Sequence, residues 1–215
     1  MFTGIVQGMA QVVECQGLGS NKRLQIQFPE SSMQSQQLGA SVSINGVCLT
    51  VVAVQADLIS FDVIDTTLTL TNLGLLAAGS IINFERAAKM GDEVGGHIMS
   101  GHIMCCLTVS QIRTQEDSHR LRFSIIESSA SEGVLAANHP MSYLFNKGYV
   151  GLNGSSLTIC DIGDNWIEVS LIPETLRLTT FGALKVDDNV NLEIDSHTQA
   201  TVDTVERILQ QKGLV

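Results

Sequence analysis

Basic residues are scarce in this chain of 215 residues: 12 lysines and arginines stand against 22 aspartates and glutamates, giving a formal net charge of −10. The shortage argues against a nucleic-acid partner, because binding to phosphates needs a basic face. No segment reaches about 18 uninterrupted apolar residues, so no membrane span is expected. The stretch MFTGIVQGMAQVV has no basic region and no long apolar run, so we expect no signal peptide.

Regularly spaced cysteines are also missing, since the five present are Cys15, Cys48, Cys105, Cys106 and Cys160. An odd number at irregular spacing indicates a reduced, cytoplasmic protein and not a disulfide framework. What the chain does have is apolar material, because 44% of its residues are hydrophobic and 16% are charged. That composition favours a folded core, and the length suggests one large domain or two of about 100 residues.

The most informative feature is an internal repeat. NGVCLTV at Asn45–Val51 returns as NGSSLTI at Asn153–Ile159, an offset of 108. Upstream, an offset of 97 relates TGIV at Thr3–Val6 to SGHI at Ser100–Ile103, so the second copy has about 11 extra residues, which we place near 128–144. The offset of 108 continues downstream and pairs Thr67 with Thr175, Gly74 with Gly182, Asn83 with Asn191, and Glu85 with Glu193.

Each copy is near 95 residues long, a length that suits a small domain. Its segments are short and alternating and are separated by glycines and polar clusters, which is typical of a small β-sandwich or barrel. TTLTLTNLG at 66–74 and PETLRLTTFG at 173–182 are predicted to be short helices that close each barrel. We expect domains at 1–95 and 96–195, joined through MGDEVGGH. The duplication serves stability alone or provides two binding pockets from one template.

Residues 196–215 differ in kind and are predicted to form a helix. Ser196 followed by Gln199 is a capping-box pattern, and Gly213 is placed to end the helix. One face is apolar, with Val202, Val205, Ile208 and Leu209. An isolated helix of this length is marginal in water, so it packs either on its own barrel or against another subunit.

The stretch GGHIMSGHIMCC holds two histidines and two cysteines, yet its spacing argues against zinc. His97 and His102 are five residues apart and would point in different directions on a strand or a helix, and the adjacent Cys105 and Cys106 would also diverge. We therefore predict no metal site. The neighbouring MGDEVGGH lacks the GK[ST] ending of a phosphate-binding loop.

Several polar residues differ between the two copies. His102 replaces Ile5, Asp195 replaces Ala87, and Cys48 replaces Ser156. Each has a structural interpretation as well: a structural histidine, a helix N-cap at Asp195 and a buried thiol at Cys48. Thr50 and Thr158 are the same in both copies. Shared hydroxyls would bind a common ligand, and the divergent groups would give its two copies different roles.

Long motifs of the chain resemble those of the riboflavin synthase family: MFTGIV, NGVCLTV, NFERAAKMGDEVGGHIMSGHIM, NGSSLTI, LIPETLRLTT and DTVERIL. The resemblance covers nearly the whole chain. It implies an all-β fold with short helices, in which two similar six-stranded Greek-key barrels are followed by a C-terminal helix that assembles a homotrimer. Each catalytic site is implied to lie between the N-barrel of one subunit and the C-barrel of its neighbour.

The implied activity is that of a transferase, the last step of riboflavin biosynthesis. Two molecules of 6,7-dimethyl-8-ribityllumazine exchange a four-carbon unit and give riboflavin and 5-amino-6-ribitylamino-pyrimidinedione (the uracil), with no metal or redox cofactor. The C7 methyl of the lumazine is acidic, so a histidine of near-neutral pKa suits the role of base. The acceptor needs a nucleophile at C7, from cysteine, serine or water. Enclosure by a lumazine synthase capsid is left open.

The resemblance implies site residues one by one. The catalytic set is Cys48, His102, Ser156 and Asp195. One ligand would contact Cys48, Leu49, Thr50, Asp62, Val63, Ile64, Asp65, Thr66, Thr67, Gly101, His102 and Ile103. The other would contact Gly4, Ile5, Val6, Lys147, Ser156, Leu157, Thr158, Ser170, Leu171, Ile172, Pro173, Glu174 and Thr175. Ser41 is carried over as a further polar contact.

The chain departs from the family pattern at two places, and two other functions compete with the enzyme. The longer segment at 128–145 is either an added surface loop or a cover for the C-barrel pocket through His139 and Tyr143. Val47 stands where a second cysteine is common in the family. The main rival function is a non-catalytic lumazine- or flavin-binding protein, whose relatives lose the polar catalytic groups. A purely structural pair of barrels is disfavoured by the asymmetric substitutions.

Overall fold

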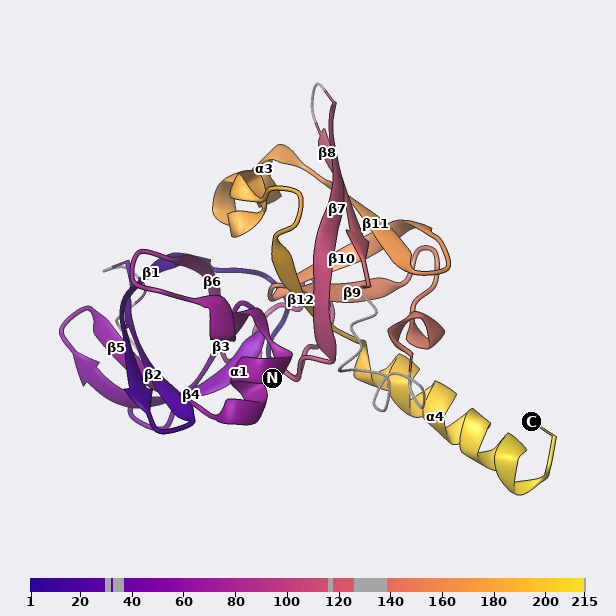
Figure 1. Ribbon diagram of the computed structural model, residues 1–215, viewed down its shortest axis with the longest axis horizontal. Helices are drawn as coiled ribbons and strands as arrows, with labels where there is room; N and C mark the ends of the chain where they lie inside the picture. The colour runs from indigo at the N-terminus through magenta and orange to yellow at the C-terminus, as the bar shows by residue number, and fades with distance from the viewer. Residues whose placement is uncertain (30–31, 33–36, 116–117, 126–138, 215) are drawn as a thin grey trace.

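The computed structural model describes residues 1–29, 32, 37–115, 118–125 and 139–214. In these ranges the chain forms two closed six-stranded β-barrels and a C-terminal helix that extends away from the second barrel (Figure 1). The predicted fold class is therefore confirmed. In the described part of the chain no helix is both long and apolar enough to cross a membrane.

The first barrel, called the N-barrel here, closes in the order β1-β2-β5-β4-β3-β6. Its strands are β1 (Gly8–Leu18), β2 (Asn21–Gln27), β3 (Ser41–Ile44), β4 (Val47–Gln55), β5 (Leu58–Val63) and β6 (Ile81–Arg86). The predicted short helix is present as α1 (Asp65–Leu70), followed by the 3₁₀ turn η2 (Asn72–Leu75). The core lies inside the closed sheet, where Leu24, Ile26, Phe61 and Phe84 are buried.

The second barrel, the C-barrel, has the same order around its circumference, since β10-β11-β8-β7-β12-β9 is the first order shifted by six strands. Its elements are β7 (Cys105–Gln115), β8 (Ser118–Ser124), η3 (Pro140–Tyr143), β9 (Tyr149–Leu152), β10 (Ser155–Ile162), β11 (Trp166–Leu171), α3 (Pro173–Leu178), η4 (Thr180–Ala183) and β12 (Asn189–Glu193). Even the bulges recur, because the register shifts after Val12 and Val51 return after Val109 and Ile159.

The predicted Asn-Gly turns lie where the two barrels meet. Asn45 and Gly46 both have positive φ, as do Asn153 and Gly154, which is the geometry of a two-residue hairpin turn. The two turns also touch: a Cβ added to Gly46 would lie 2.8 Å from the Gly154 nitrogen. Glycine is therefore required here for its backbone angles and for the close approach of two chains.

Related residues face one another across this seam, as expected for a two-fold axis between the copies. Phe2 and Met99, which are 97 apart, exchange two backbone hydrogen bonds of 2.8 and 2.9 Å. Asn191 Nδ2 donates to the Asn45 carbonyl at 2.8 Å, and Asn83 Nδ2 donates to the Asn153 carbonyl at 3.0 Å. The barrels are thus joined by the same contact made twice.

Replacing Asn191 with alanine should destabilise the fold. Asn191 is fully buried, donates to Asn45 and to Asn72 Oδ1, and accepts from the Asn72 nitrogen at 2.7 Å. Because its buried partners would lose their hydrogen bonds, we expect the free energy of unfolding to fall by about 2–4 kcal/mol. Urea unfolding measures this change, with the exposed Asn165→Ala as control. A loss no larger than that of the control would contradict the role of the seam.

The C-terminal helix α4 (Ser196–Gln211) begins one residue earlier than the predicted capping box implies. Asp195, not Ser196, is the N-cap, because its Oδ1 accepts from both the nitrogen and the hydroxyl of Thr198 at 2.8 Å. A carboxylate there also faces the positive end of the helix dipole. Gly213, with φ 64°, ends the helix as predicted.

Most of α4 stands free of the barrel. Only Val202 joins the C-barrel core from this helix, while Val205 and Ile208 are 50% and 42% exposed. Tyr143 Oη donates to Asp203 Oδ1 at 2.6 Å, so Tyr143 anchors α4. His139 accepts from the Met141 nitrogen at the start of η3. The rest of the inserted segment, up to residue 138, lies outside the described residues.

Candidate functional site

Two short segments leave their own barrel and contact the other one. Residues 3–6 come before β1, and residues 100–103 come before β7. The Gly4 carbonyl accepts from the Ser156 nitrogen at 2.8 Å, and the Gly101 carbonyl accepts from the Cys48 nitrogen at 3.0 Å. A Cβ on either glycine would lie 2.5 Å from the facing Cβ, so only glycine allows this approach. We call residues 3–6 and 100–103 the crossing segments.

A buried glutamate holds each crossing segment. Glu85 Oε1 accepts from the nitrogen and the hydroxyl of Thr3 at 2.6 and 2.7 Å, and Oε2 accepts from the Gly4 nitrogen at 3.1 Å. Glu193 makes the related contacts with the Ser100 nitrogen and hydroxyl and with the Gly101 nitrogen, at 2.6 to 3.2 Å. Burial raises the pKa of both carboxyl groups, although these hydrogen bonds act in the opposite direction.

The N-barrel site is a small pocket beside the second crossing segment. It has a volume of about 230 Å³ and brings together many of the residues predicted for one ligand. Its lining is Val47, Cys48, Thr66, Thr67, Leu70, Thr71, Gly101, His102 and Ile103. The thiol of Cys48 and the exposed His102 thus share one cavity, although they are far apart in the sequence and lie on different barrels.

The other residues predicted for this ligand are not among those that line the cavity. Ser41 is directly opposite Thr50 across the β3–β4 pairing, so the two hydroxyls lie on one face of the sheet. Asp62 makes a bidentate ion pair with Arg23 at 2.7 and 2.8 Å, and these bonds lower its pKa. Leu49 and Val63 are buried in the barrel core. Ile64 and Asp65 lie at the exposed start of α1.

The C-barrel site is centred on a serine–histidine pair. His97 Nδ1 lies 2.6 Å from Ser156 Oγ, and the ring of His97 stacks on Tyr149 with centroids 5.3 Å apart. His97 is 7% exposed, and its Nε2 has no hydrogen-bond partner in the described structure. Such a pair of hydroxyl and imidazole is the arrangement that activates a nucleophile or a bound water.

The electrostatics of this pair favour a neutral imidazole. Burial lowers the pKa of His97, and the nearby carboxylate of Asp195 acts in the opposite direction. Burial alone would raise the pKa of Asp195, but its hydrogen bonds from Thr198 and the interaction with His97 lower it. Asp195 is therefore ionised. It caps α4 and at the same time raises the pKa of His97. A neutral histidine beside a hydroxyl can take up a proton at neutral pH.

The remaining residues predicted for the second ligand follow the same plan as the first. Thr158 lies on the face of Ser156 and opposite Tyr149, which stands where the first copy has Ser41. Leu171 is buried in the core. Lys147 is exposed and has φ 67° at the position where the first copy has Gly39. The end of β11 and the start of α3 hold Ser170, Ile172, Pro173, Glu174 and Thr175. The first crossing segment holds Ile5 and Val6, and β10 holds Leu157.

His97 was not predicted as a site residue. The comparison of the two copies selected residues that differ between them. At the offset of 97, the first residue that has a partner is 98, so His97 could not be compared. The strand and helix geometries used for His97 and His102 do not apply, because both residues lie outside regular elements. The two histidines belong to different sites, one on each barrel. The missed signal was the run GGH, since a Cβ on Gly96 would lie 2.5 Å from Ser156 Cβ.

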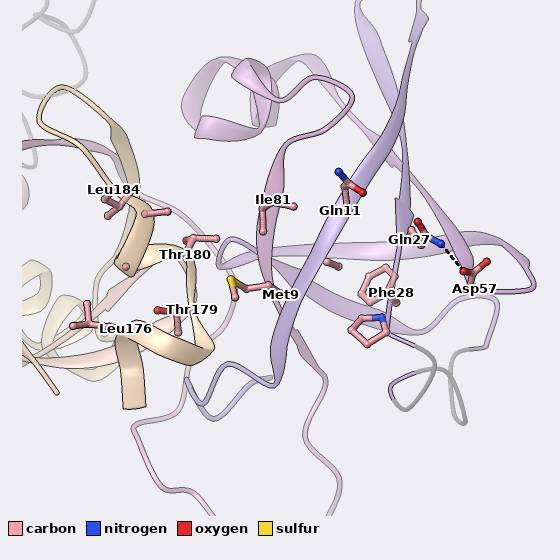
Figure 2. Close-up of a pocket in the computed structure, with 14 residues that line it drawn as sticks. Met9, Gln11, Gln27, Phe28, Asp57, Ile81, Leu176, Thr179, Thr180 and Leu184 are labelled. Atoms are coloured by element: carbon pink, nitrogen blue, oxygen red, sulfur yellow. Dashed lines mark hydrogen bonds between the residues drawn. The ribbon is translucent and has the colours of Figure 1, made fainter. Parts of the chain in front are cut away.

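A larger groove of about 1020 Å³ lies elsewhere, between the outer face of the N-barrel and the end of α3. Figure 2 shows Met9, Ile81 and Phe28 on one side, and Leu176, Thr179, Thr180 and Leu184 on the other. Gln27 and Asp57 form a hydrogen bond at its far end. None of the predicted reactive residues lines this groove. The thiol, hydroxyl and imidazole groups lie instead at the N-barrel pocket and at the serine–histidine pair.

Known proteins share this duplication. The Lumazine binding domain family matches the chain twice, at residues 3–87 and 100–195, so each match begins with a crossing segment. The riboflavin synthase of Escherichia coli (strain K12) is 43% identical over 209 residues, which cover 97% of this chain and 93% of that protein. The chain belongs to the riboflavin synthase family.

Solved structures similar to this riboflavin synthase family member include two of LumP. A crystal structure of LumP complexed with 6,7-dimethyl-8-(1'-D-ribityl) lumazine matches with a TM-score of 0.77 and 26% identity. A LumP structure complexed with riboflavin has the same TM-score and 28% identity. Each covers 91% of this chain and 100% of the LumP chain. The LumP structures thus share the double-barrel architecture described above.

Proposed function

We propose that this protein is a riboflavin synthase that converts two molecules of 6,7-dimethyl-8-ribityllumazine into riboflavin and 5-amino-6-ribitylaminouracil by transfer of a four-carbon unit. The observation that carries the proposal is a pair of sites built from one template with different reactive groups. One holds Cys48 with His102, and the other holds Ser156 with His97. A dismutation needs this arrangement, because the same molecule must be bound twice and treated differently.

The C-barrel site supplies a base. Neutral His97 accepts a proton through Nδ1 from the Ser156 hydroxyl, or from a water that the hydroxyl positions. The resulting imidazolium would be stabilised by the ionised Asp195 beside it. In this site the hydroxyl or water adds to C7 of one lumazine, which prepares that molecule to accept carbons. No metal or redox cofactor enters these steps.

The N-barrel site would hold the second lumazine. The hydroxyls of Thr66 and Thr67 and the exposed His102 offer polar contacts beside Cys48. The exposed Ile64 and the related Ile172 in the other site offer apolar surface for a planar ring. A cavity of about 230 Å³ is small for such a ligand, since ligand pockets are typically about 300–1,000 Å³. The small size supports completion of the site by a neighbouring subunit.

Incubation with the lumazine tests the function directly. Riboflavin formation, followed by its absorbance, is expected in the absence of any added metal or cofactor. The rival function is a non-catalytic binder, as the LumP complexes with lumazine and riboflavin illustrate. A binder would quench or shift the fluorescence of both ligands and form no riboflavin. That result would reject the enzyme and keep the ligand class.

We also propose that three subunits associate through α4 and that the protein works in a reducing, cytoplasmic setting, which its five free cysteines support. The exposed Val205 and Ile208 form the apolar stripe that would meet another subunit. Association would bring the N-barrel site of one subunit against the C-barrel site of the next, so that the two rings can stack and react.

Substituting both Val205 and Ile208 with aspartate should disrupt this association. Each apolar side chain contributes about 2 kcal/mol when buried at an interface, so we expect a shift to monomers with folded barrels and most turnover lost. Analytical ultracentrifugation and the riboflavin assay measure both effects. Gln210→Asp, on the opposite side of α4, is the matched control. Point substitutions are preferable to deletion, which would also remove the contacts of Val202 and Asp203. A double variant that stays trimeric would reject the role of α4.

A further inference from the structure

Two buried carboxylates have no part in the chemistry proposed above. Glu85 and Glu193 are each 2% exposed and lie at related positions on the last strand of each barrel. Neither forms an ion pair in the described structure, and each is satisfied by two backbone N–H groups and one hydroxyl. Burying a carboxylate without a cation is costly, so the arrangement calls for a reason.

The groups that each carboxylate holds serve the other barrel. Glu193 is on the C-barrel, yet it fixes Ser100 and Gly101, and the Gly101 carbonyl then accepts from the nitrogen of Cys48 on the N-barrel. The next residue, His102, lines the N-barrel pocket. Glu85 is on the N-barrel and fixes Thr3 and Gly4, and the Gly4 carbonyl accepts from Ser156 on the C-barrel.

We propose that Glu85 and Glu193 are positioning residues that act across the two barrels, Glu193 on the Cys48 site and Glu85 on the Ser156 site. The carboxylate of each barrel sets where the crossing segment lies, and the segment in turn forms one wall of the opposite site. The inference rests on the proposed function in one respect, because it takes each barrel to have its own ligand site.

Only a carboxylate can make all these contacts. It has two oxygens and accepts at both, whereas a glutamine has one oxygen and one N–H₂ donor. In Glu193→Gln, the amide oxygen can still accept from Ser100. The Gly101 N–H, which is now shared between the two carboxylate oxygens at 3.1 and 3.2 Å, would lose one acceptor and face the N–H₂ donor in its place. The substitution keeps the size of the side chain and converts one buried hydrogen bond into a contact between two donors. It should therefore release the crossing segment while the barrel remains folded.

The reactivity of Cys48 reports on the N-barrel site without any ligand. Gly101 is packed against Cys48, so a displaced segment exposes the thiol. Burial raises the pKa of the other four thiols, to about 12 for Cys105 and about 11 for Cys106, so they compete little for iodoacetamide. Mass spectrometry of the Cys48 peptide then follows one site alone. In an S156C variant the introduced thiol reports on the C-barrel site in the same way.

The test compares E193Q and E85Q, with the exposed Glu14→Gln as matched control. We expect E193Q to speed the alkylation of Cys48 roughly tenfold, which corresponds to one lost charged hydrogen bond, and to leave S156C unchanged. We expect E85Q to do the reverse. In riboflavin titrations, protection of Cys48 by the ligand should be lost in E193Q and kept in E85Q.

A purely structural role would give a different pattern. If each variant affects the site on its own barrel, or both sites equally, the cross-barrel inference is wrong. Should either glutamine variant fail to fold, Ser100→Ala and Thr3→Val are the alternatives. They remove the hydroxyl contact with the carboxylate and the hydrogen bond that the same hydroxyl accepts from the nitrogen of His102 or Ile5, and the same opposite pattern is required of them. The proposed function can fail without deciding this test. If the wild-type chain neither forms nor binds riboflavin, the two alkylation rates can still be measured and still test the positioning role.

Discussion

His97→Gln should lower the turnover of the lumazine by about 10²–10⁴-fold, the range that a positioned general base contributes. Glutamine keeps the approximate size of the side chain and a hydrogen-bonding group near Ser156 Oγ, which lies 2.6 Å from His97 Nδ1, but it cannot take up a proton. Binding of riboflavin should change much less, because the loss is confined to the proton transfer. Steady-state rates and fluorescence titration measure the two effects.

The pH dependence gives a second measurement of the same assignment. Burial lowers the pKa of His97, and the neutral imidazole is the active form. The rate should therefore stay high as the pH falls toward 6.5, the usual histidine value, and decline only below it. His197→Gln, on the exposed start of α4, is the matched control. The charge of His197 contributes to the low pKa of Asp195 but does not act on His97 directly, so we expect a much smaller change in the profile. If His102→Gln lowers turnover more than His97→Gln does, the base belongs to the N-barrel site.

Much of the fold could be predicted because local sequence and repetition agree. The Asn-Gly pairs predicted tight turns, and both have the expected positive φ. The sequence 66–74 alternates like a strand, but the Pro-Glu of its second copy indicated helices, which are present as α1 and α3. A pattern that is ambiguous in one copy was thus decided by the other.

The site was predictable only where the copies differ. Cys48, His102, Ser156 and Asp195 were selected as substitutions within a repeat. Cys48 and His102 line one pocket, Ser156 contacts His97 and Asp195 affects the pKa of His97, while their catalytic roles stay predictions. Glu85 and Glu193 are identical in both copies, so the same comparison passed over them. Their function depends on where the crossing segments lie, and that is a tertiary contact between residues more than 80 positions apart.

A fragment of residues 1–95 should fold and bind riboflavin but catalyse no dismutation. It contains all six strands, α1 and η2 of the N-barrel, so its core is complete except for Ile103, which belongs to the second crossing segment. It lacks Gly101–Ile103, which form one wall of the pocket beside Cys48. The fragment has its own crossing segment, Gly4–Val6, which is related to the missing one by the repeat. Because the seam between the barrels is made of reciprocal contacts, two fragments can pair and each supply that wall to the other.

The seam makes this pairing favourable. In a lone fragment Asn83 would lose its acceptor at the Asn153 carbonyl, and Asn72 would lose Asn191. In a pair, Asn45 and Asn83 of the second copy provide the same groups, and Glu85 of each copy still holds its own Thr3 and Gly4. We therefore expect a symmetric dimer with two like sites. It should form no riboflavin, because it has no Ser156, His97 or Asp195.

Ultracentrifugation tests the dimer, fluorescence titration tests the binding of riboflavin, and the riboflavin assay tests the absence of turnover. Substantial turnover by the fragment would reject the division of roles between unlike barrels, and tight binding by a monomeric fragment would reject the need for a crossing segment.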